Sequence, residues 1–431
     1  MLTINNQPLI CGVLSILCTW FVMDTLACMS ERTEPPEKMK KGSCQEGKNI
    51  EDADYRDKVF DQKKPVGGKP KTVFVKVLVV VEKELYKKII KKYKEGGKAP
   101  PRFDPSTRSS DDLEREVVLY VRKFMTAVNL GFRTFTNPRI EFSIAGVIHK
   151  LKKKFGSGVQ ALKPWEENRK MKDRIDKQPG TYHYDVILTL VGRRILQSIQ
   201  STRYDILKKQ PNPDDEEIDK TIHDGVYGTS GLGEACSPNK GSIFIQDLGQ
   251  FSGLKTAVHH FGHFLGSRHD GENNDCCSSD FYRMSNFVFD ATNSDHVKKI
   301  EENAHKWSSC SKKLIEDFVI KAPCLHNRPK NDKYYTLFSW QQLGDSNIPS
   351  LKEQCYGYYK ETEKGKHCNQ RNDLNVCNHL QCSNSDVQCE INTINYAMEG
   401  SVCQVGKVEG RCLQGKCIKR NKKSNYLLIL G

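Results

Sequence analysis

Four histidines lie within twelve residues, in the segment H-H-F-G-H-F-L-G-S-R-H-D that runs from His259 to Asp270. On a helix His259 and His263 would lie one turn apart on the same face, so both imidazoles could reach one metal ion. Gly266 can take the left-handed conformation that ends a helix, which would bring His269 back as a third ligand. Three neutral imidazoles leave the fourth tetrahedral position of a zinc ion open, as in a catalytic site. The spacing therefore predicts a zinc site.

A more ordinary explanation is that these histidines are solvated surface groups or hydrogen-bonded core groups. That explanation usually holds for a single histidine. Here three histidines at this spacing occur in one segment with Gly266 and Asp270. The metal site is therefore the favoured interpretation. Whether such a site hydrolyses anything is a separate question, because it depends on a proton acceptor near the metal.

The elements that would position these residues begin at Thr72. Thr72 to Val81 is a nearly continuous β-branched run, typical of a strand buried on both faces, and 82–92 is predicted to be helical. A second helix is predicted from Ser110 onward. Its apolar side chains recur at three- and four-residue spacing, at Leu113, Val117, Val121, Phe124, Val128 and Phe132.

Three further strands and the histidine helix complete this domain. Strands are predicted at 139–148, which alternates as a half-buried strand should, at 184–191 and at 242–246. The helix that carries the first two zinc ligands is predicted at 253–265. Strands that alternate with helices predict an α/β domain with a mostly parallel, twisted sheet.

A glycine-rich stretch, Asp224 to Ala235, precedes the last of these strands. Glycines there could let a substrate backbone lie along an edge strand, which is a common way of holding extended peptides. An ordinary loop beside a disulfide would explain the same glycines equally well. Both interpretations stay open at this point.

The chain of 431 residues is long enough for more than one domain. An apolar run from Pro8 to Met23, followed by the small residues Thr25 and Ala27, is typical of a signal peptide, although no Lys or Arg precedes it. The predicted organisation is a signal peptide at 1–27, a charged flexible arm at 28–71, the α/β domain at 72–325, a linker at 326–350, a cysteine-rich domain at 351–420 and a tail at 421–431.

The cysteine content is typical of an oxidising compartment. Nine of the 17 cysteines lie between Cys324 and Cys417, which indicates a separate disulfide-rich module. Cleavage after residue 27 would remove two of the 17 and leave 15, so one thiol, with Cys28 or Cys44 the obvious candidates, would be free or paired between chains. No later stretch is apolar enough to span a membrane. We therefore expect a soluble, secreted, extracellular protein.

The net charge of +14 makes an anionic partner plausible. The densest basic run lies between Lys150 and Lys177, and a sulfated polysaccharide would suit it, although a solvated basic face is the more ordinary explanation. Nucleic acid is not expected as a partner, because the export signals place the protein outside the cell.

The histidine segment resembles the H-E-x-x-H-x-x-G-x-x-H signature of the metzincin proteases. Asp270 after the third histidine resembles the reprolysin branch, which contains the snake-venom and ADAM metalloproteases, and Met284 matches the methionine turn beneath the zinc of that family. The resemblance implies a zincin-like fold for 72–325 and a disulfide between Cys236 and Cys310.

The segment from Cys377 to Cys417 is similar to the cysteine-rich module of ADAMTS-like proteases. The whole chain most resembles the salivary metalloproteases of ticks. Glu82 lies where relatives often hold an acidic calcium ligand, so calcium is a second candidate cofactor that rests on one carboxylate.

The resemblance implies a zinc metalloendopeptidase that hydrolyses peptide bonds of extracellular proteins through zinc-bound water. His260 stands where the family carries the glutamate that takes the proton from this water. An imidazole could accept a proton near neutral pH, but a nearby zinc dication disfavours its protonation, and its shorter side chain points differently. The alternative is a catalytically inactive pseudo-protease that keeps its zinc and binds a host protein.

Overall fold

The computed structural model describes residues 70–95, 110–149, 241–286, 293–327 and 348–358, together with parts of 161–237 and of 366–419. Several predictions concern residues outside this set: the signal peptide at 1–27, nearly all of the arm at 28–71, the thiols of Cys28 and Cys44, most of the basic run from Lys150 to Lys177, and the tail at 421–431.

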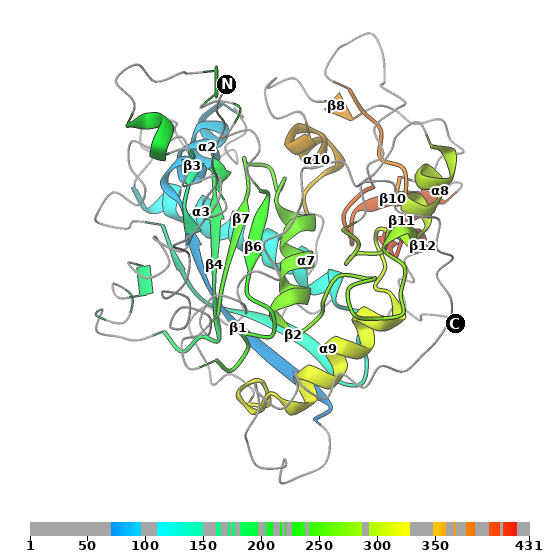
Figure 1. Cartoon of the computed structure of the whole chain (residues 1–431). Helices are drawn as coiled ribbons and strands as arrows, with labels where there is room; N and C mark the ends of the chain where they lie inside the picture. The colour runs from blue at the N-terminus through cyan, green and yellow to red at the C-terminus, as the bar shows by residue number, and fades with distance from the viewer. Residues whose placement is uncertain are drawn as a thin grey trace, which may run out of the picture.

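A five-stranded sheet in the order β2-β1-β4-β7-β6 forms the centre of the domain (Figure 1). Its strands are β1 (Thr72–Val81), β2 (Arg139–Ile148), β4 (Val186–Val191), β6 (Gly228–Ser230) and β7 (Gly241–Gln246). The first four strands in this order pair in parallel, and β6 pairs with β7 in the antiparallel direction. The predicted α/β class with a mostly parallel sheet is therefore confirmed, and the glycine-rich stretch supplies an edge strand.

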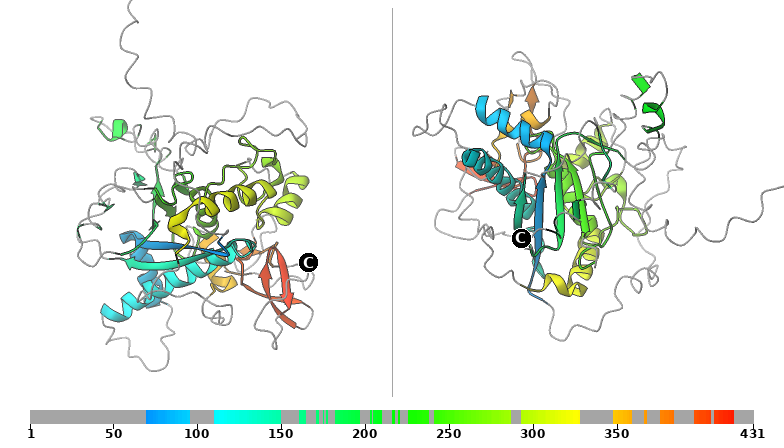
Figure 2. Two further views of the ribbon diagram at one scale, coloured as in Figure 1. Left: turned by 90° about the horizontal axis from the view of Figure 1, so that it is seen from below. Right: turned by 90° about the vertical axis from the view of Figure 1, so that its left-hand side faces the viewer.

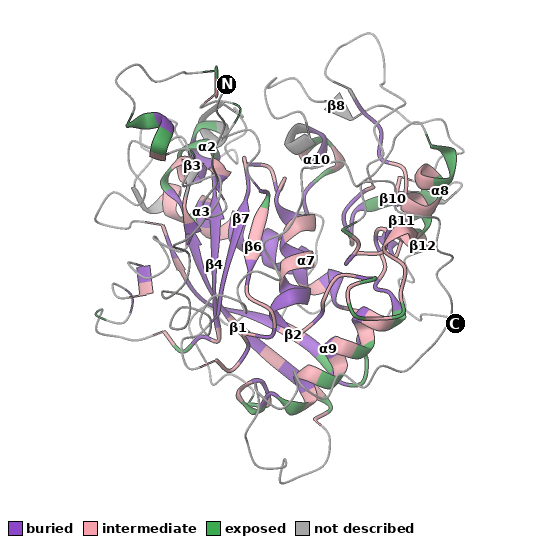
Figure 3. Cartoon of the chain, viewed as in Figure 1, coloured by how far each residue is buried: buried purple, intermediate pink, exposed green. Residues whose placement is uncertain are grey.

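Both faces of the sheet are covered, as Figure 3 shows by the buried colour of its central strands. Every residue of β4 and β7 is buried. In β1 burial on both faces begins at Val77, whereas Phe74 and Lys76 are only partly buried. The Lys76 Nζ pairs with Asp185 at 3.2 Å, which neutralises a charge that the sheet half buries.

Strand β2 is more deeply buried than predicted. A half-buried strand would expose every second residue, but in β2 only Arg139 is exposed. The reason is that both faces of β2 are covered, because Ile144 packs into the core on one face and Ala145 into the core on the other. The strand also carries a β-bulge, since Ile144 pairs with Val77 and Gly146 pairs with Leu78, which leaves Ala145 as an extra residue.

Four long helices pack against one face of the sheet, in the same core as the odd-numbered side chains of β1. They are α2 (Lys83–Glu95), α3 (Ser110–Gly131), α7 (Leu254–Phe264) and α9 (Ser309–Lys321), and α8 (Ser294–Asn303) precedes α9. The predicted stripe of α3 is buried at Val117, Val121, Phe124 and Val128. Among the described residues no helix is long and apolar enough to cross a membrane.

The C-terminal module is small and rich in disulfides. It contains α10 (Leu351–Tyr358), the pair β8 (Lys366–His367) and β9 (Cys382–Ser383), and an antiparallel sheet of β10 (Val402–Val405), β11 (Val408–Leu413) and β12 (Lys416–Lys419). Its disulfides among the described residues join Cys355 with Cys382, Cys377 with Cys412, and Cys403 with Cys417. Figure 2 shows the three-stranded sheet beside one end of α3, and not detached from the domain.

Candidate metal centre

Helix α7 carries the first two histidines of the predicted site. It spans Leu254–Phe264, within one residue of the prediction at each end, and Leu254, Ala257, Val258, Phe261 and Phe264 form its buried side. Gly266, at φ +92°, ends it with two backbone hydrogen bonds, from the Gly266 N–H to the His263 carbonyl (2.8 Å) and from the Ser267 N–H to the Gly262 carbonyl (2.9 Å). This Schellman geometry needs a residue that tolerates positive φ. A Cβ at Gly266 would also lie 2.8 Å from the Phe318 ring.

The turn brings three Nε2 atoms together. His259 and His263 are 3.0 Å apart at Nε2, His263 and His269 are 3.1 Å apart, and His259 and His269 are 3.2 Å apart. A tetrahedral zinc ion with Zn–N bonds of about 2.0–2.1 Å separates its nitrogen ligands by roughly 3.3 Å. Among the described residues these histidines form a group that could hold a metal ion, and the spacing of the donors fits zinc.

The Nδ1 atoms fix which nitrogen of each ring carries the hydrogen. His259 Nδ1 lies 2.7 Å from the Arg283 carbonyl oxygen, and His263 Nδ1 lies 2.7 Å from that of Ser267. Because a carbonyl oxygen only accepts, both Nδ1 atoms must donate, and both Nε2 atoms present lone pairs. Lone pairs at about 3 Å repel one another unless a cation lies between them. The hydrogen bonds therefore point to a metal as the missing partner.

Burial keeps two of these imidazoles neutral. Desolvation, followed by repulsion from the charge that His269 would carry, lowers the pKa of His259 to about 4. Desolvation also lowers the pKa of His263 well below its usual value. Neutral imidazoles are the form that binds a metal, so the site is ready for one at neutral pH.

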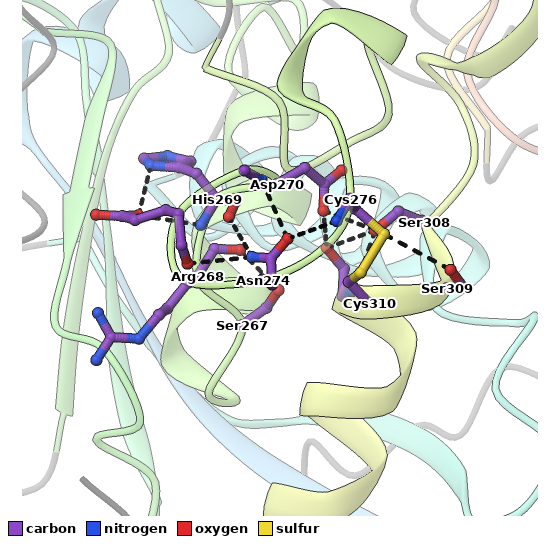
Figure 4. The surroundings of a disulfide bond; sticks show 12 residues. Ser267, Arg268, His269, Asp270, Asn274, Cys276, Ser308, Ser309 and Cys310 are labelled. Carbon is purple, nitrogen blue, oxygen red and sulfur yellow. Dashed lines mark hydrogen bonds and ion pairs between the residues drawn. A yellow bond between two sulfur atoms is a disulfide. The ribbon is translucent and has the colours of Figure 1, made fainter. Parts of the chain in front are cut away.

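The loop after α7 holds the third histidine (Figure 4). Glu272 Oε2 lies 3.3 Å from His269 Nδ1 and 3.2 Å from its backbone nitrogen, and Asn274 Nδ2 donates to the His269 carbonyl at 2.7 Å. Asp270 accepts hydrogen bonds from the hydroxyls of Ser308 (2.6 Å) and Ser311 (2.9 Å) at the start of α9. The loop is thus tied to a helix N-terminus, where a carboxylate is favoured.

Met284 packs against helix α7. It is fully buried, and a Cβ added to Gly262 would lie 2.8 Å from its Sδ. Its carbonyl accepts from the Asp270 N–H at 3.0 Å. The methionine therefore packs against the α7 backbone between the positions of His259 and His263, and its backbone anchors the start of the ligand loop.

His260 is turned toward the edge strand β6. Its Nδ1 lies 3.0 Å from the Ser230 Oγ, and the same hydroxyl lies 3.3 Å from the His260 carbonyl oxygen. A Cβ added to Gly228 would lie 2.5 Å from His260 Cδ2 and 2.6 Å from its Nε2. Desolvation, followed by the charge of His259, lowers the pKa of His260 well below its usual value. His260 does not belong to the group of converging nitrogens.

The prediction of a disulfide between Cys236 and Cys310 is wrong. Cys236 pairs with Cys324, and Cys310 pairs with Cys276 of the ligand loop, as Figure 4 shows for the second bond. Cys310 lies in the first turn of α9 and Cys324 lies just beyond its end, about 20 Å away at 1.5 Å per residue. Gly233 and Gly266 both lie against Phe318 in the last turns of α9, so Cys236 is near the far end of that helix.

Other residues around the metal centre have a weak sequence signal or none. The carbonyls of Ser267 and Arg283 act through backbone atoms, which no residue type reveals. Glu272 could have been predicted as a partner of His269, because a carboxylate three residues after a ligand is within reach of its Nδ1.

Glu82, the candidate calcium ligand, makes other contacts. Its carboxylate is bound by Arg193 at 2.8 Å and by the N–H groups of Gly192 and Glu84, so guanidinium and amide donors contact it.

No protein-family model matches this chain. It is 26% identical over 328 residues to a protein of Bombyx mori described as "A disintegrin and metalloproteinase with thrombospondin motifs like". This alignment covers 71% of this chain and 42% of the relative. It is 27% identical over 231 residues to human "A disintegrin and metalloproteinase with thrombospondin motifs 18", with 53% of this chain and 16% of the relative covered.

A third relative is "Venom metalloproteinase 3" of Eulophus pennicornis, 27% identical over 215 residues, or 49% of this chain and 46% of the relative. A solved structure titled "Structure of a chaperone-substrate complex" aligns with 60% of this chain and 36% of that chain at 14% identity and a TM-score of 0.34, too low to define a shared fold. The chain spans less than half the length of each curated relative named here. Its homologues are therefore metalloproteinases of the ADAMTS-like and venom types.

Proposed function

We propose that this chain is a secreted zinc-binding protein with a metalloendopeptidase scaffold, which holds a segment of an extracellular protein at its metal centre. His259, His263 and His269 would hold the ion. Zinc, when bound, supplies a Lewis acid and lowers the pKa of a coordinated water to about 7. The observation that carries the proposal is the set of three converging Nε2 atoms, 3.0 to 3.2 Å apart, beside a histidine in place of a carboxylate.

We further propose that hydrolysis by this scaffold is about 10²- to 10⁴-fold slower than with a glutamate at position 260, the usual contribution of a positioned base. A general base must lie within hydrogen-bond reach of the proton it takes. The Nδ1 edge of His260 contacts Ser230, and its Cδ2–Nε2 edge contacts Gly228. Both edges of the ring therefore meet β6, which supports a non-catalytic position.

One observation favours the second candidate function, an active endopeptidase that uses His260. If Nδ1 donates to the Ser230 hydroxyl and this hydroxyl donates to the His260 carbonyl, both contacts are satisfied at once. The hydrogen is then fixed on Nδ1, and Nε2 keeps a lone pair that could accept a proton. The two candidates differ in whether this lone pair reaches the substrate side of the centre.

Strand β6 is the place where we propose that an extended polypeptide binds. It is the edge of the five-stranded sheet and lies beside α7, which carries the first two ligands. Tyr227, directly before β6, has 49% of its surface exposed and stacks with the Arg194 guanidinium at 5.4 Å. An added strand would find unpaired backbone groups at such an edge and side-chain contacts at such a tyrosine.

Five disulfides among the described residues fit an oxidising compartment and support secretion. The signal peptide, a salivary setting and a sulfated polysaccharide partner stay predictions. A calcium ion at Glu82 has no support from its contacts, because its carboxylate already binds Arg193 and two backbone N–H groups.

The test is digestion of an unfolded protein substrate by the zinc-loaded chain, with and without a chelator. His260→Glu is compared with the native protein, and His263→Ala, which removes a ligand, serves as the inactive control. Cleavage by His260→Glu alone, abolished by the chelator, is the expected result. Chelator-sensitive cleavage by the native chain at a similar rate would instead support the active endopeptidase.

A further inference from the structure

Arg283 connects the metal centre to the C-terminal module. Its carbonyl oxygen accepts the hydrogen bond from His259 Nδ1 at 2.7 Å, and its backbone N–H donates to the Lys306 carbonyl at 3.0 Å. Its Nη2 donates to the His305 carbonyl at 2.6 Å and to Glu399 Oε1 at 3.1 Å. One residue thus orients a metal ligand through its backbone and binds the module through its side chain.

Glu399 is itself fixed within the module. Its two carboxylate oxygens accept from the backbone N–H of Gln414, in the turn between β11 and β12, at O···N distances of 3.0 and 3.3 Å. The side chains of Glu399 and Arg283 are only 10% and 7% exposed. Water therefore screens this pair weakly, and removal of the carboxylate would leave a buried guanidinium without its anion.

The module is seated tightly around this pair. A Cβ at Gly415, in the same turn as Gln414, would lie 2.2 Å from the His305 ring. The turn can therefore pack against His305 only because residue 415 has no side chain. The Tyr396 hydroxyl donates to the Ala304 carbonyl at 3.0 Å, and the Lys255 Nζ of α7 lies 3.5 Å from the centre of the Tyr396 ring. Glu399 therefore has little freedom to follow Arg283 if that residue moves.

We propose that Glu399 is a positioning residue of the metal centre, which holds Arg283 so that its carbonyl directs His259 Nε2 at the ion. The C-terminal module is then part of the metal centre and not a tethered accessory. This inference rests on the metal binding of the proposed function, but it does not depend on whether the chain cleaves peptides.

The chain of contacts from Glu399 through Arg283 to His259 supports a positioning role, in addition to holding the module against the domain. A carboxylate or carbonyl that accepts from the far nitrogen of a ligating histidine commonly changes metal affinity by about 10- to 100-fold when it is lost. Arg283 supplies this carbonyl to His259, and Glu399 is the charged partner of its guanidinium. When Glu399 is absent, the guanidinium gains freedom to turn toward water, and residue 283 loses a restraint on its backbone.

The test compares Glu399→Ala with Glu301→Ala in the full chain. Glu301 accepts from His379 Nδ1 at 2.8 Å, so its loss also removes a contact between domain and module but leaves Arg283 untouched. Burial outweighs the opposing effects of Arg283 and the Gln414 N–H and raises the pKa of Glu399 to about 7, so measurements at about pH 8 keep most of the carboxylate ionised. The readouts are zinc affinity by chelator competition, the visible spectrum of the Co²⁺-loaded protein, and the unfolding midpoint of the metal-free protein.

We expect Glu399→Ala to weaken zinc binding by about 10-fold or more and to shift the Co²⁺ spectrum, with Glu301→Ala near the native chain in both. If Glu399→Ala fails to fold, Glu399→Gln, which keeps an acceptor for Gln414, should weaken zinc binding by a smaller factor. Native zinc affinity and an unchanged Co²⁺ spectrum in either folded Glu399 variant would overturn the inference. Failure of the native chain itself to bind zinc would instead overturn the proposed function.

Discussion

The Nε2 atoms of His259, His263 and His269 lie closer together than neutral imidazoles would settle without a cation. The helix repeat places the first two, and the positive φ of Gly266 returns the third. Each Nδ1 then meets an acceptor: two carbonyls and the Glu272 carboxylate. The chemistry of this centre therefore depends on the acceptors behind the rings as much as on the rings themselves.

Loss of Glu272 should weaken the metal site. Its hydrogen bond with His269 is the largest cause of the lowered pKa of Glu272, so the carboxylate is ionised and orients the ring. We expect Glu272→Ala to reduce zinc affinity by about 10- to 100-fold, measured by chelator competition. Glu409→Ala, an exposed change on β11, is the matched control. Equal zinc affinity in both variants would contradict the role of Glu272.

The ligands could be predicted from sequence because a helix fixes the spacing of its side chains, and a glycine that ends the helix is visible as a residue type. The carbonyls of Ser267 and Arg283 could not be predicted, because every residue has a carbonyl and only the folded chain places it. The direction of His260 was equally hidden, since it depends on the absence of a Cβ at Gly228 and on the Ser230 hydroxyl.

Strand β6 and helix α7 interlock through His260. Gly228 and Ser230 are two residues apart, so they face the same side of the strand, and both contact that ring. From the glycines alone, an edge strand and an ordinary loop beside a disulfide are equally good interpretations of this stretch. Its contact with the helix needs the tertiary structure, because pattern alone does not tell which side of a short strand a helix covers.

Gly228→Ala should be destabilising, and the cost should depend on His260. The added Cβ would lie 2.5 to 2.6 Å from the His260 ring and 2.8 Å from the Thr256 methyl group. We expect Gly228→Ala to lower the free energy of unfolding by about 1–3 kcal/mol, as overpacking usually does. In a His260→Ala background only the Thr256 contact remains, so the cost should fall. Urea denaturation of the four proteins gives the coupling, and equal costs in both backgrounds would argue against this contact.

The disulfides show where sequence patterns stop. Cysteine spacing alone allows many pairings, and the correct ones depend on the direction and length of α9. Cys276 reaches Cys310 because Asp270 brings the ligand loop to the start of that helix. Cys236 reaches Cys324 at the other end.

Peptide mapping should recover the pairs Cys236–Cys324 and Cys276–Cys310, and a peptide that joins Cys236 with Cys310 would refute this arrangement. The second bond closes a loop with a sequence separation of 34 residues. In the chain-entropy treatment its loss costs about 3–4 kcal/mol. We therefore expect the double variant Cys276→Ser with Cys310→Ser to show this decrease in urea denaturation, with weaker zinc binding because the loop carries His269.

The sequence suggests two domains joined by a linker at 326–350, and the boundaries stay predictions. The structure shows how the two parts meet. Met398 of the module belongs to the main hydrophobic core, together with side chains of β1, α3 and Trp307. Gly400 approaches Leu130 at the end of α3, where a Cβ would lie 2.7 Å from the leucine side chain. Among the described residues, the ion pairs Lys123–Glu353 and Arg283–Glu399 and the hydrogen bond between His379 and Glu301 also cross between the parts.

A shared core should make the domain and the module unfold together. If the module unfolded alone, Met398 and the Arg283–Glu399 pair would lose their partners, and the main core would lose the Met398 side chain. We therefore expect a single calorimetric transition, which Met398→Ala shifts as a whole with a loss of about 2–5 kcal/mol. Val402→Ala, at a position 39% exposed on β10, should stay within about 0.5 kcal/mol of the native chain. Two separate transitions, with only the smaller one moved by Met398→Ala, would show that the module folds as an independent body and that the metal centre needs no support from it.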